Sequence, residues 1–554
     1  MLYHLSYNTI GTAKILKKYK LPNFSSKLPI FAFGMTYVKV ILPLMLDWLP
    51  TYSTTDALNR GDRVKVRFGA RCYTGVVSET DCAPEIDPGR IQPVLGKVLE
   101  PVSEEELKLW EFCADYYMCS IGEIYKAAYP QLTIRTEEIG ARKKAKAPAT
   151  VREPGIRWAG PQTAPKPLVL RSADRLAVYE DEIRNTIGEG RDTLILAPDK
   201  AGLKLLQKAL KPSFGDRLRV FSSGISAVAR REIIDDLRDG EQSVVLLGTS
   251  LALFLPYGNL GTIIVEDEHS SLYKRQDPAP RINGRDLAVV LAGIHRSRIL
   301  LGSPTPSLET IAALKSGKYL RDKRSSERHP TVEVIDMSAE KRKRGVRGLF
   351  SLKALDALRE EKGKSLILRG WEKEEELDGN FRSASLYERQ SEHCDLAVVL
   401  QADCLLGKDN FRADEQAWQT LAGIDADRII IQTSRPEHPV LSALENGTDP
   451  DFDAMLSERK SADLPPFTRG LDLIVRDRNA DRRNAVCDEL LRRLCFLGEA
   501  LRTERDDCSR LGFATARSSA SVELKRRALR TVNRYLRESK YPGAVHFDVD
   551  PRDI

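Results

Sequence analysis

The chain contains 554 residues, of which 42% are hydrophobic and 30% are charged, a balance typical of a globular protein with about two to four domains. No apolar run approaches the length of a membrane-spanning helix, so we expect no membrane partner. The formal net charge of +7 is low for this length, which argues against a protein that coats nucleic acid through uniform positive charge.

Most of the net positive charge lies in a basic extension, residues 1–34, which holds five lysines and no acidic residue. The rest of the chain carries 81 basic and 79 acidic residues, so any contact with nucleic acid must be local. The extension lacks the continuous apolar stretch of a secretory signal. We interpret it as a mis-assigned start that precedes Met35, and an unstructured basic arm is the alternative.

Residues 35–103 have the pattern of a small β domain. A strand is predicted over residues 38–43, and residues 61–69 (GDRVKVRFG) alternate with a period of two and end at a glycine. Residues 73–77 follow as the partner strand of a hairpin. An ordinary barrel with a solvated basic face would show the same pattern.

Residues 104–136 predict two helices, and Ser103 stands as the N-cap before three glutamates in the first turn. Residues 137–167 are rich in lysine, arginine, alanine and proline. This composition is typical of a flexible basic linker.

Residues 168–325 alternate apolar runs with helical patterns, which predicts a doubly wound α/β sheet. The run at residues 262–265 ends in Glu-Asp-Glu-His, and the carboxyl ends of such strands hold the ligand site in open α/β sheets. A later run at residues 299–301 leads into Gly-Ser-Pro-Thr-Pro. Acids beside a Ser/Thr strand are typical of a nucleotide-driven motor, in which the acids hold Mg²⁺ and polarise water.

An ordered series of motifs fills residues 247–310, namely LGTSLALF, VEDEH with a following Tyr-Lys, GRD and LGSPTPSLET. The series resembles the PriA family (primosomal protein N-prime, the replication-restart helicase), whose members carry IGTRSALF, IVDEEH, ARD and LGSATPSLET motifs. The resemblance implies a RecA-like helicase lobe over residues 168–325 with ATP and Mg²⁺ as ligands. It also implies a catalytic acidic motif formed by Glu266, Asp267, Glu268 and His269.

The resemblance extends to residues 35–103, which look like the family's 3′-DNA-binding domain, the part that captures the 3′ end of a nascent strand at a fork. It implies a DNA-binding set made of Thr51, Tyr52, Lys65, Arg67, Gly69, Arg71 and Gln92. In such a set the glycine lets the backbone approach the terminal sugar, the aromatic stacks on a base, and the cations face phosphates. Residues 104–136 resemble the start of the family's winged-helix domain, which is therefore expected to be partial.

The phosphate loop that should follow the first strand is degenerate. A P-loop needs glycines that let backbone amides cradle phosphate, a lysine for the β and γ phosphates, and a hydroxyl on Mg²⁺. Residues 172–177 read SADRLA, so that Asp174 adds negative charge and the Leu176 side chain cannot bind Mg²⁺. Arg175 remains as the nucleotide-binding candidate, although it does not simply replace a compact lysine ammonium. Because Glu266 also stands where the family has aspartate, we expect a decayed ATPase.

Residues 326–460 resemble a truncated second helicase lobe, in which Ile424 replaces a family arginine that reaches the γ-phosphate. The family's zinc module with eight cysteines has no counterpart there. The nine cysteines of the chain are scattered without a C-x-x-C pair, so zinc is not expected. Residues 461–554 resemble the family's α+β C-terminal domain, including its DVDP ending.

Two functional hypotheses follow. The first is a primosomal protein that binds branched or forked DNA, single-stranded DNA and nascent 3′ ends in replication restart, with its ATPase decayed. The resemblance implies primosome proteins, single-stranded DNA-binding protein and the replicative helicase as partners, in the cytoplasm at the bacterial nucleoid. The alternative is an active ATP-dependent 3′-to-5′ helicase with an aberrant P-loop, and a decaying copy without a role is a third reading. Losses at three separate nucleotide contacts favour the first.

Overall fold

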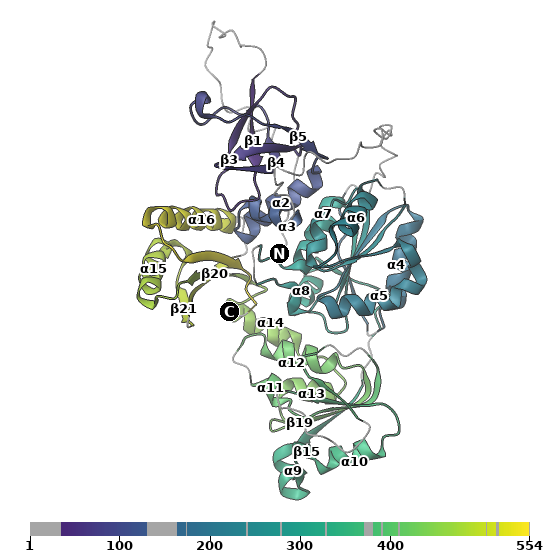
Figure 1. Ribbon diagram of the computed structural model, residues 1–554. Coiled ribbons are helices and arrows are strands. Elements are labelled where there is room, and N and C mark those ends of the chain that lie inside the picture. The colour runs from purple at the N-terminus through teal and green to yellow at the C-terminus, as the bar shows by residue number, and fades with distance from the viewer. Residues whose placement is uncertain are drawn as a thin grey trace. The chain divides into compact units, whose positions relative to one another are not determined.

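The computed structural model divides the chain into two compact units, one that includes residues 35–107 and 120–129 and one that includes residues 108–119 and most of the chain after residue 162 (Figure 1). The residues that it describes are 35–129, 163–172, 174–239, 242–276, 280–326, 330–370, 381–388, 392–407, 410–505, 507–516 and 520–552. The basic extension 1–34, residues 130–136 of the partial winged helix and most of the basic linker lie outside them. Among the described helices, none is both long and apolar enough to cross a membrane.

The first unit is built on a five-stranded antiparallel sheet in the order β2-β1-β4-β3-β5. Its strands are β1 (Thr36–Ile41), β2 (Thr51–Thr54), β3 (Arg63–Phe68), β4 (Arg71–Glu79) and β5 (Gly96–Leu99). Alternate residues of β1 and β3, such as Val38 and Val64, fill the core, as the period of two predicts. The predicted hairpin is confirmed, because β3 pairs with β4 and Gly69 turns the chain with a φ of +59°.

Helix α2 (Glu104–Tyr117) begins in the first unit and ends in the second. The predicted N-cap is confirmed, since Ser103 Oγ accepts from the amide of Glu106 at 3.1 Å and the Glu106 carboxylate accepts from the amide of Ser103 at 2.9 Å. Helix α3 (Ile121–Ala128) starts with the same reciprocal arrangement at Ser120 and Glu123.

The second unit contains a seven-stranded parallel sheet in the order β12-β6-β11-β10-β7-β9-β8, which with its helices we call lobe 1. Its strands are β6 (Leu168–Arg171), β7 (Asp192–Leu196), β8 (Leu218–Phe221), β9 (Val245–Gly248), β10 (Leu260–Glu266), β11 (Arg298–Ser303) and β12 (Leu320–Arg321). Its helices are α4 (Leu176–Gly188), α5 (Lys200–Phe214), α6 (Ala227–Asp239), α7 (Gly284–His295) and α8 (Leu308–Lys315). Helices α4 and α5 cover one face of the sheet and α7 the other (Figure 1). Parallel strands buried on both faces explain the continuous apolar runs in the sequence.

A second parallel sheet, in the order β13-β19-β18-β16-β17, forms lobe 2. Its strands are β13 (Thr331–Asp336), β16 (Ser365–Arg369), β17 (Arg382–Ser385), β18 (Cys394–Val399) and β19 (Ala426–Thr433), and the short strands β14 (Val346–Arg347) and β15 (Phe350–Ser351) pair beside it. Its helices are α9 (Met337–Lys343), α10 (Leu352–Glu360), α11 (Asp403–Leu406), α12 (Ala413–Ala422), α13 (Pro439–Glu445) and α14 (Phe452–Ser461). Phe452 joins α14 to this lobe by packing edge-on against Trp418, with ring centroids 5.0 Å apart.

The last part of the chain folds as a four-stranded antiparallel sheet in the order β21-β22-β20-β23 with two helices, an α+β arrangement. Its elements are β20 (Thr468–Arg476), α15 (Ala480–Arg493), β21 (Ala500–Glu504), β22 (Cys508–Ala516), α16 (Ala520–Ser539) and β23 (Ala544–Val549).

Candidate functional site

The residues that the sequence analysis aligned with a phosphate loop lie between the end of β6 and the start of α4. Arg175 immediately precedes α4, and its side chain is buried, with only 8% of the residue exposed. Asp174, by contrast, is exposed. The one cation of this segment therefore points into lobe 1, where the acidic end of β10 lies.

Arg175 forms a two-pronged ion pair with Glu266, the last residue of β10. Its Nη2 donates to Glu266 Oε1 at 2.7 Å and its Nε to Oε2 at 3.0 Å, while Nη2 also donates to Asp267 Oδ1 at 2.8 Å. The remaining Nη1 donates to the carbonyl of Ser172 at 2.7 Å. Tyr179, one turn into α4, donates its hydroxyl to Glu266 Oε2 at 2.6 Å. Each carboxylate oxygen of Glu266 thus already has a donor from this chain.

The electrostatics of this cluster favour the ion pair over the neutral forms. Burial works against the charged guanidinium, but the negative charges of Glu266 and Asp267 outweigh it and raise the pKa of Arg175 well above its usual value. Burial, followed by the charge of Glu266, likewise raises the pKa of the Tyr179 hydroxyl. At neutral pH the arginine is charged and the tyrosine keeps its proton.

The space around the pair is filled by side chains. A Cβ placed on Gly302 of β11 would lie 1.8 Å from the Tyr179 hydroxyl and 3.2 Å from Arg175 Cδ. A triphosphate with Mg²⁺ does not fit this arrangement, because the guanidinium occupies the acidic ligands and no backbone cradle of glycines faces them.

Glu268 and His269, the other members of the expected catalytic motif, also have internal partners. Glu268 is 1% exposed and accepts from the amide of Ser307 at 2.7 Å, from the Thr310 hydroxyl at 2.9 Å and from Arg285 Nη1 at 3.2 Å. The His269 ring shares a hydrogen bond of 2.7 Å between Nδ1 and Ser303 Oγ. Burial lowers the pKa of His269 to about 4, so the ring is neutral at neutral pH. The structure places all four acidic-motif residues together after β10, each with a polar partner from this chain.

In the first unit the structure divides the expected DNA-binding residues. Lys65 and Arg67 alternate on β3 and share one face, whereas Arg71 pairs with Phe68 and shares the other face. Gly69 and Arg71 are exposed at the tip of the hairpin.

Two residues of the expected set, Thr51 and Gln92, are both positioned by the backbone of β2. Thr51 opens β2 and is half-buried, and exposed Gln92 accepts from the amide of Ser53 through its carbonyl at 3.0 Å. The role expected of Tyr52 is corrected, because its ring is 2% exposed and its hydroxyl donates to the carbonyl of Arg67 at 3.1 Å. A buried ring cannot stack on a base. Burial also raises the pKa of Tyr52 to about 12.

Among the described residues of this unit, the exposed aromatic is Trp48, which the sequence reasoning passed over. Its residue is 53% exposed, and its ring centroid lies 6.2 Å from that of Phe68, on the face that also carries Arg71. A tryptophan in a short segment between Pro43 and Pro50, without a helical or strand pattern, was the signal available in the sequence. Across the described part of the chain, no group of three metal-ligating side chains is present.

Comparisons with known proteins identify relatives of this chain. Residues 39–130 match the PriA 3′ DNA-binding domain (3′BD). A replication restart protein PriA from Rickettsia prowazekii is 29% identical over 322 residues, 55% of this chain and 49% of that protein. The corresponding protein from Haemophilus influenzae is 35% identical over 150 residues, 27% of this chain and 20% of that protein.

Among solved structures, RecG bound to a three-way DNA junction aligns with a TM-score of 0.34 and 13% identity. The alignment covers 53% of this chain and 44% of RecG, and a similarity this distant does not bear on fold or mechanism. The chain spans about half the length of the curated relatives it matches first. The domain match and the matches to PriA proteins of several bacteria together support membership of this chain in the PriA family.

Proposed function

We propose that this chain binds branched DNA and nascent 3′ ends in replication restart, and that it does so without ATP-driven unwinding. The observation that carries the proposal is the buried ion pair between Arg175 and Glu266, which occupies the nucleotide site with the chain's own charges. Lobe 1 and lobe 2 are, in this proposal, a RecA-like helicase lobe and its truncated second partner.

The cost of opening the nucleotide site supports the loss of ATPase activity. Breaking a buried ion pair typically costs about 3–5 kcal/mol, because it leaves an uncompensated charge in the interior. Each 1.4 kcal/mol is a tenfold change in affinity, so ATP would bind about 10²- to 4 × 10³-fold more weakly than to an open site. The missing P-loop glycines and lysine remove the contacts that would offset this cost.

The first unit supports the DNA-binding half of the proposal. It matches the 3′ DNA-binding domain over residues 39–130, and its hairpin carries Arg67 and Arg71 on the surface. Neither arginine has an ion-pair partner among the described residues, so both are available to phosphates. Trp48 supplies an exposed ring near Phe68, the strand partner of Arg71, and base stacking on such a ring does not depend on base identity. Primosome proteins, single-stranded DNA-binding protein and the replicative helicase would then dock on a protein already seated at the fork.

The test is a comparison of fluorescently labelled forks in the presence of ATP and Mg²⁺. One fork carries a nascent strand with a free 3′-hydroxyl and the other carries the same strand ending in a 3′-phosphate. We expect tighter binding to the hydroxyl fork and no strand separation in either. Unwinding of the duplex would establish the alternative, an active helicase, and equal binding to both forks would refute recognition of the 3′ end.

Arginine variants test whether the hairpin of the first unit contacts DNA phosphates. Arg67→Ala and Arg71→Ala should each reduce the slope of log affinity against log salt by about 1, since each removes about one phosphate contact. Lys204→Ala, which removes an exposed cation from α5 of lobe 1, is the matched control and should leave the slope unchanged.

A further inference from the structure

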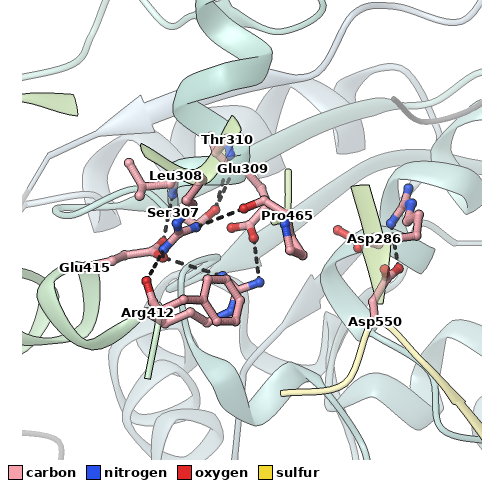
Figure 2. Close-up of polar contacts among 12 residues, drawn as sticks. Asp286, Ser307, Leu308, Glu309, Thr310, Arg412, Glu415, Pro465 and Asp550 are labelled. Carbon is pink, nitrogen blue, oxygen red and sulfur yellow. Dashed lines mark hydrogen bonds and ion pairs between the residues drawn. The ribbon is translucent and has the colours of Figure 1, made fainter. Parts of the chain in front are cut away.

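The N-terminus of α8 is capped by carboxylates from both lobes. Ser307 precedes the helix, and Glu268, two residues after β10 in lobe 1, accepts from the amide of Ser307 at 2.7 Å. The next amide, that of Leu308, donates to Glu415 Oε1 of α12 in lobe 2 at 2.8 Å (Figure 2). The amide of the N-cap residue and the first amide of the helix are thus satisfied by different lobes.

Glu415 is itself held by arginines of lobe 2. It is 3% exposed, and its second oxygen accepts from Arg459 Nη2 of α14 at 2.7 Å and lies 3.5 Å from Arg412 Nη1. Arg459, 3% exposed, also donates to the carbonyls of Phe411 and Pro465, each at 3.4 Å. These partners leave the Glu415 carboxylate in one position, aimed at α8.

Arg412 makes the second polar connection between the lobes. Its Nη2 lies 2.7 Å from Glu309 Oε1 in the first turn of α8 (Figure 2). Burial alone would raise the pKa of Glu309, but the charges of Arg412, Arg285 and Arg459 outweigh it and lower the pKa. The carboxylate of Glu309 is therefore ionised and paired at neutral pH. We call Glu309, Arg412, Glu415 and Arg459 the lobe clasp.

Apolar packing and a second ion pair reinforce the clasp. Leu308 and Ile311 of α8 form a buried cluster with Leu456 of α14. Arg171, at the end of β6 in lobe 1, forms a two-pronged ion pair with Asp449, which precedes α14. The two lobes are therefore joined by apolar contacts, by buried charges and by a separate ion pair.

We propose that the lobe clasp locks the two α/β lobes into one rigid block, whose geometry does not change with nucleotide. Lobe closure and opening in a motor require contacts that exchange between two arrangements. Here separation of the lobes would take Arg412 away from Glu309 and the amide of Leu308 away from Glu415, and no bound nucleotide would compensate for these losses. Glu268, in the motif that resembles a motor's catalytic acids, now helps to cap the helix that the clasp grips.

The test is the distance between spin labels on the outer faces of the two lobes, at Lys204 of α5 and Glu360 of α10, introduced as unnatural amino acids because the chain has nine cysteines. Both positions are exposed. We expect a single narrow distance distribution that is the same in the free protein, with ATP and Mg²⁺, and with forked DNA. A second population in the wild type, or a distance that shifts on addition of ATP, would overturn the proposal.

Variants test whether the clasp is the cause. Arg412→Gln should broaden the distance distribution or split it into two populations. Arg382→Gln breaks an exposed pair with Glu392 within lobe 2 and serves as the matched control, with an unchanged distribution expected. An unchanged narrow distribution in Arg412→Gln would refute the role of the clasp. If that variant does not fold, the distances measured in the wild type with and without ATP still decide whether the two lobes form one rigid block. This comparison can be made without DNA, so it does not depend on the proposed DNA binding.

Discussion

Replacement of Arg175 by methionine should strongly destabilise lobe 1. The change keeps a side chain of similar length but removes the donors to Glu266, Asp267 and the Ser172 carbonyl. Glu266 would then lose its paired charge while it stays buried, with the Tyr179 hydroxyl still donating to it.

The magnitude follows from the charge separation and the burial. Two unit charges about 4 Å apart interact by about 4 kcal/mol at an effective dielectric constant of about 20. Removal of one partner from a buried pair costs about 3–5 kcal/mol in measured cases. We therefore expect Arg175→Met to lower the free energy of unfolding by about 3–5 kcal/mol. Arg175→Met combined with Glu266→Leu removes both charges and should recover much of that loss.

Urea unfolding followed by circular dichroism measures this effect. Arg184→Met is the control, because Arg184 lies on the same helix α4 and its ion pair with Glu180 at 2.6 Å is exposed on the arginine side, at 54%. We expect the control to cost less than about 1 kcal/mol. A loss of less than about 1 kcal/mol in Arg175→Met, or stabilisation of the wild type by ATP and Mg²⁺, would contradict an arginine-filled nucleotide site.

Three further outcomes are expected. The pKa of His269 is about 4 in the fold and 6.5 in the unfolded chain, so the unfolded chain takes up the proton first and the free energy of unfolding falls as the pH drops from 6.5 to 4. In thermal unfolding across that range, His269→Asn should remove about 2–3 kcal/mol of this fall. Identical pH profiles of stability for the variant and the wild type would refute this role of His269. Trp48→Ala should weaken single-stranded DNA binding by about 1–3 kcal/mol in fluorescence anisotropy, whereas Tyr387→Ala, which removes an equally exposed aromatic (53%) from lobe 2, should not. Gly302→Ala should destabilise the protein by about 1–3 kcal/mol, because the methyl group would displace the Tyr179 hydroxyl. Gly293→Ala on α7 is the control, since its methyl group would meet nothing within 4 Å, and it should be neutral or stabilising. Equal melting temperatures for the two variants would refute the close contact between Gly302 and Tyr179.

Local patterns predicted local structure. The alternation over residues 61–69 and its closing glycine identified the hairpin, and Ser103 with three following glutamates identified the start of α2. The apolar run at residues 262–265 identified the central strand that carries the acidic motif. In each case the physical cause lies within a few residues, in side-chain periodicity, capping or turn geometry. The short strand β8 was not predicted, because its four residues, LRVF, offer too little periodicity.

The sequence by itself determined that residues 172–177 do not have the residue types of a P-loop and that an apolar run ends in an acidic motif, since both depend on residue types at fixed spacing. Only the tertiary structure decided that Arg175 pairs with Glu266, 91 residues away, that the ring of Tyr52 is buried, and that Glu415 caps α8 from the other lobe. Sequence periodicity reports which face of an element is apolar. It does not report which distant element covers that face, because burial and ion pairing depend on how whole elements pack.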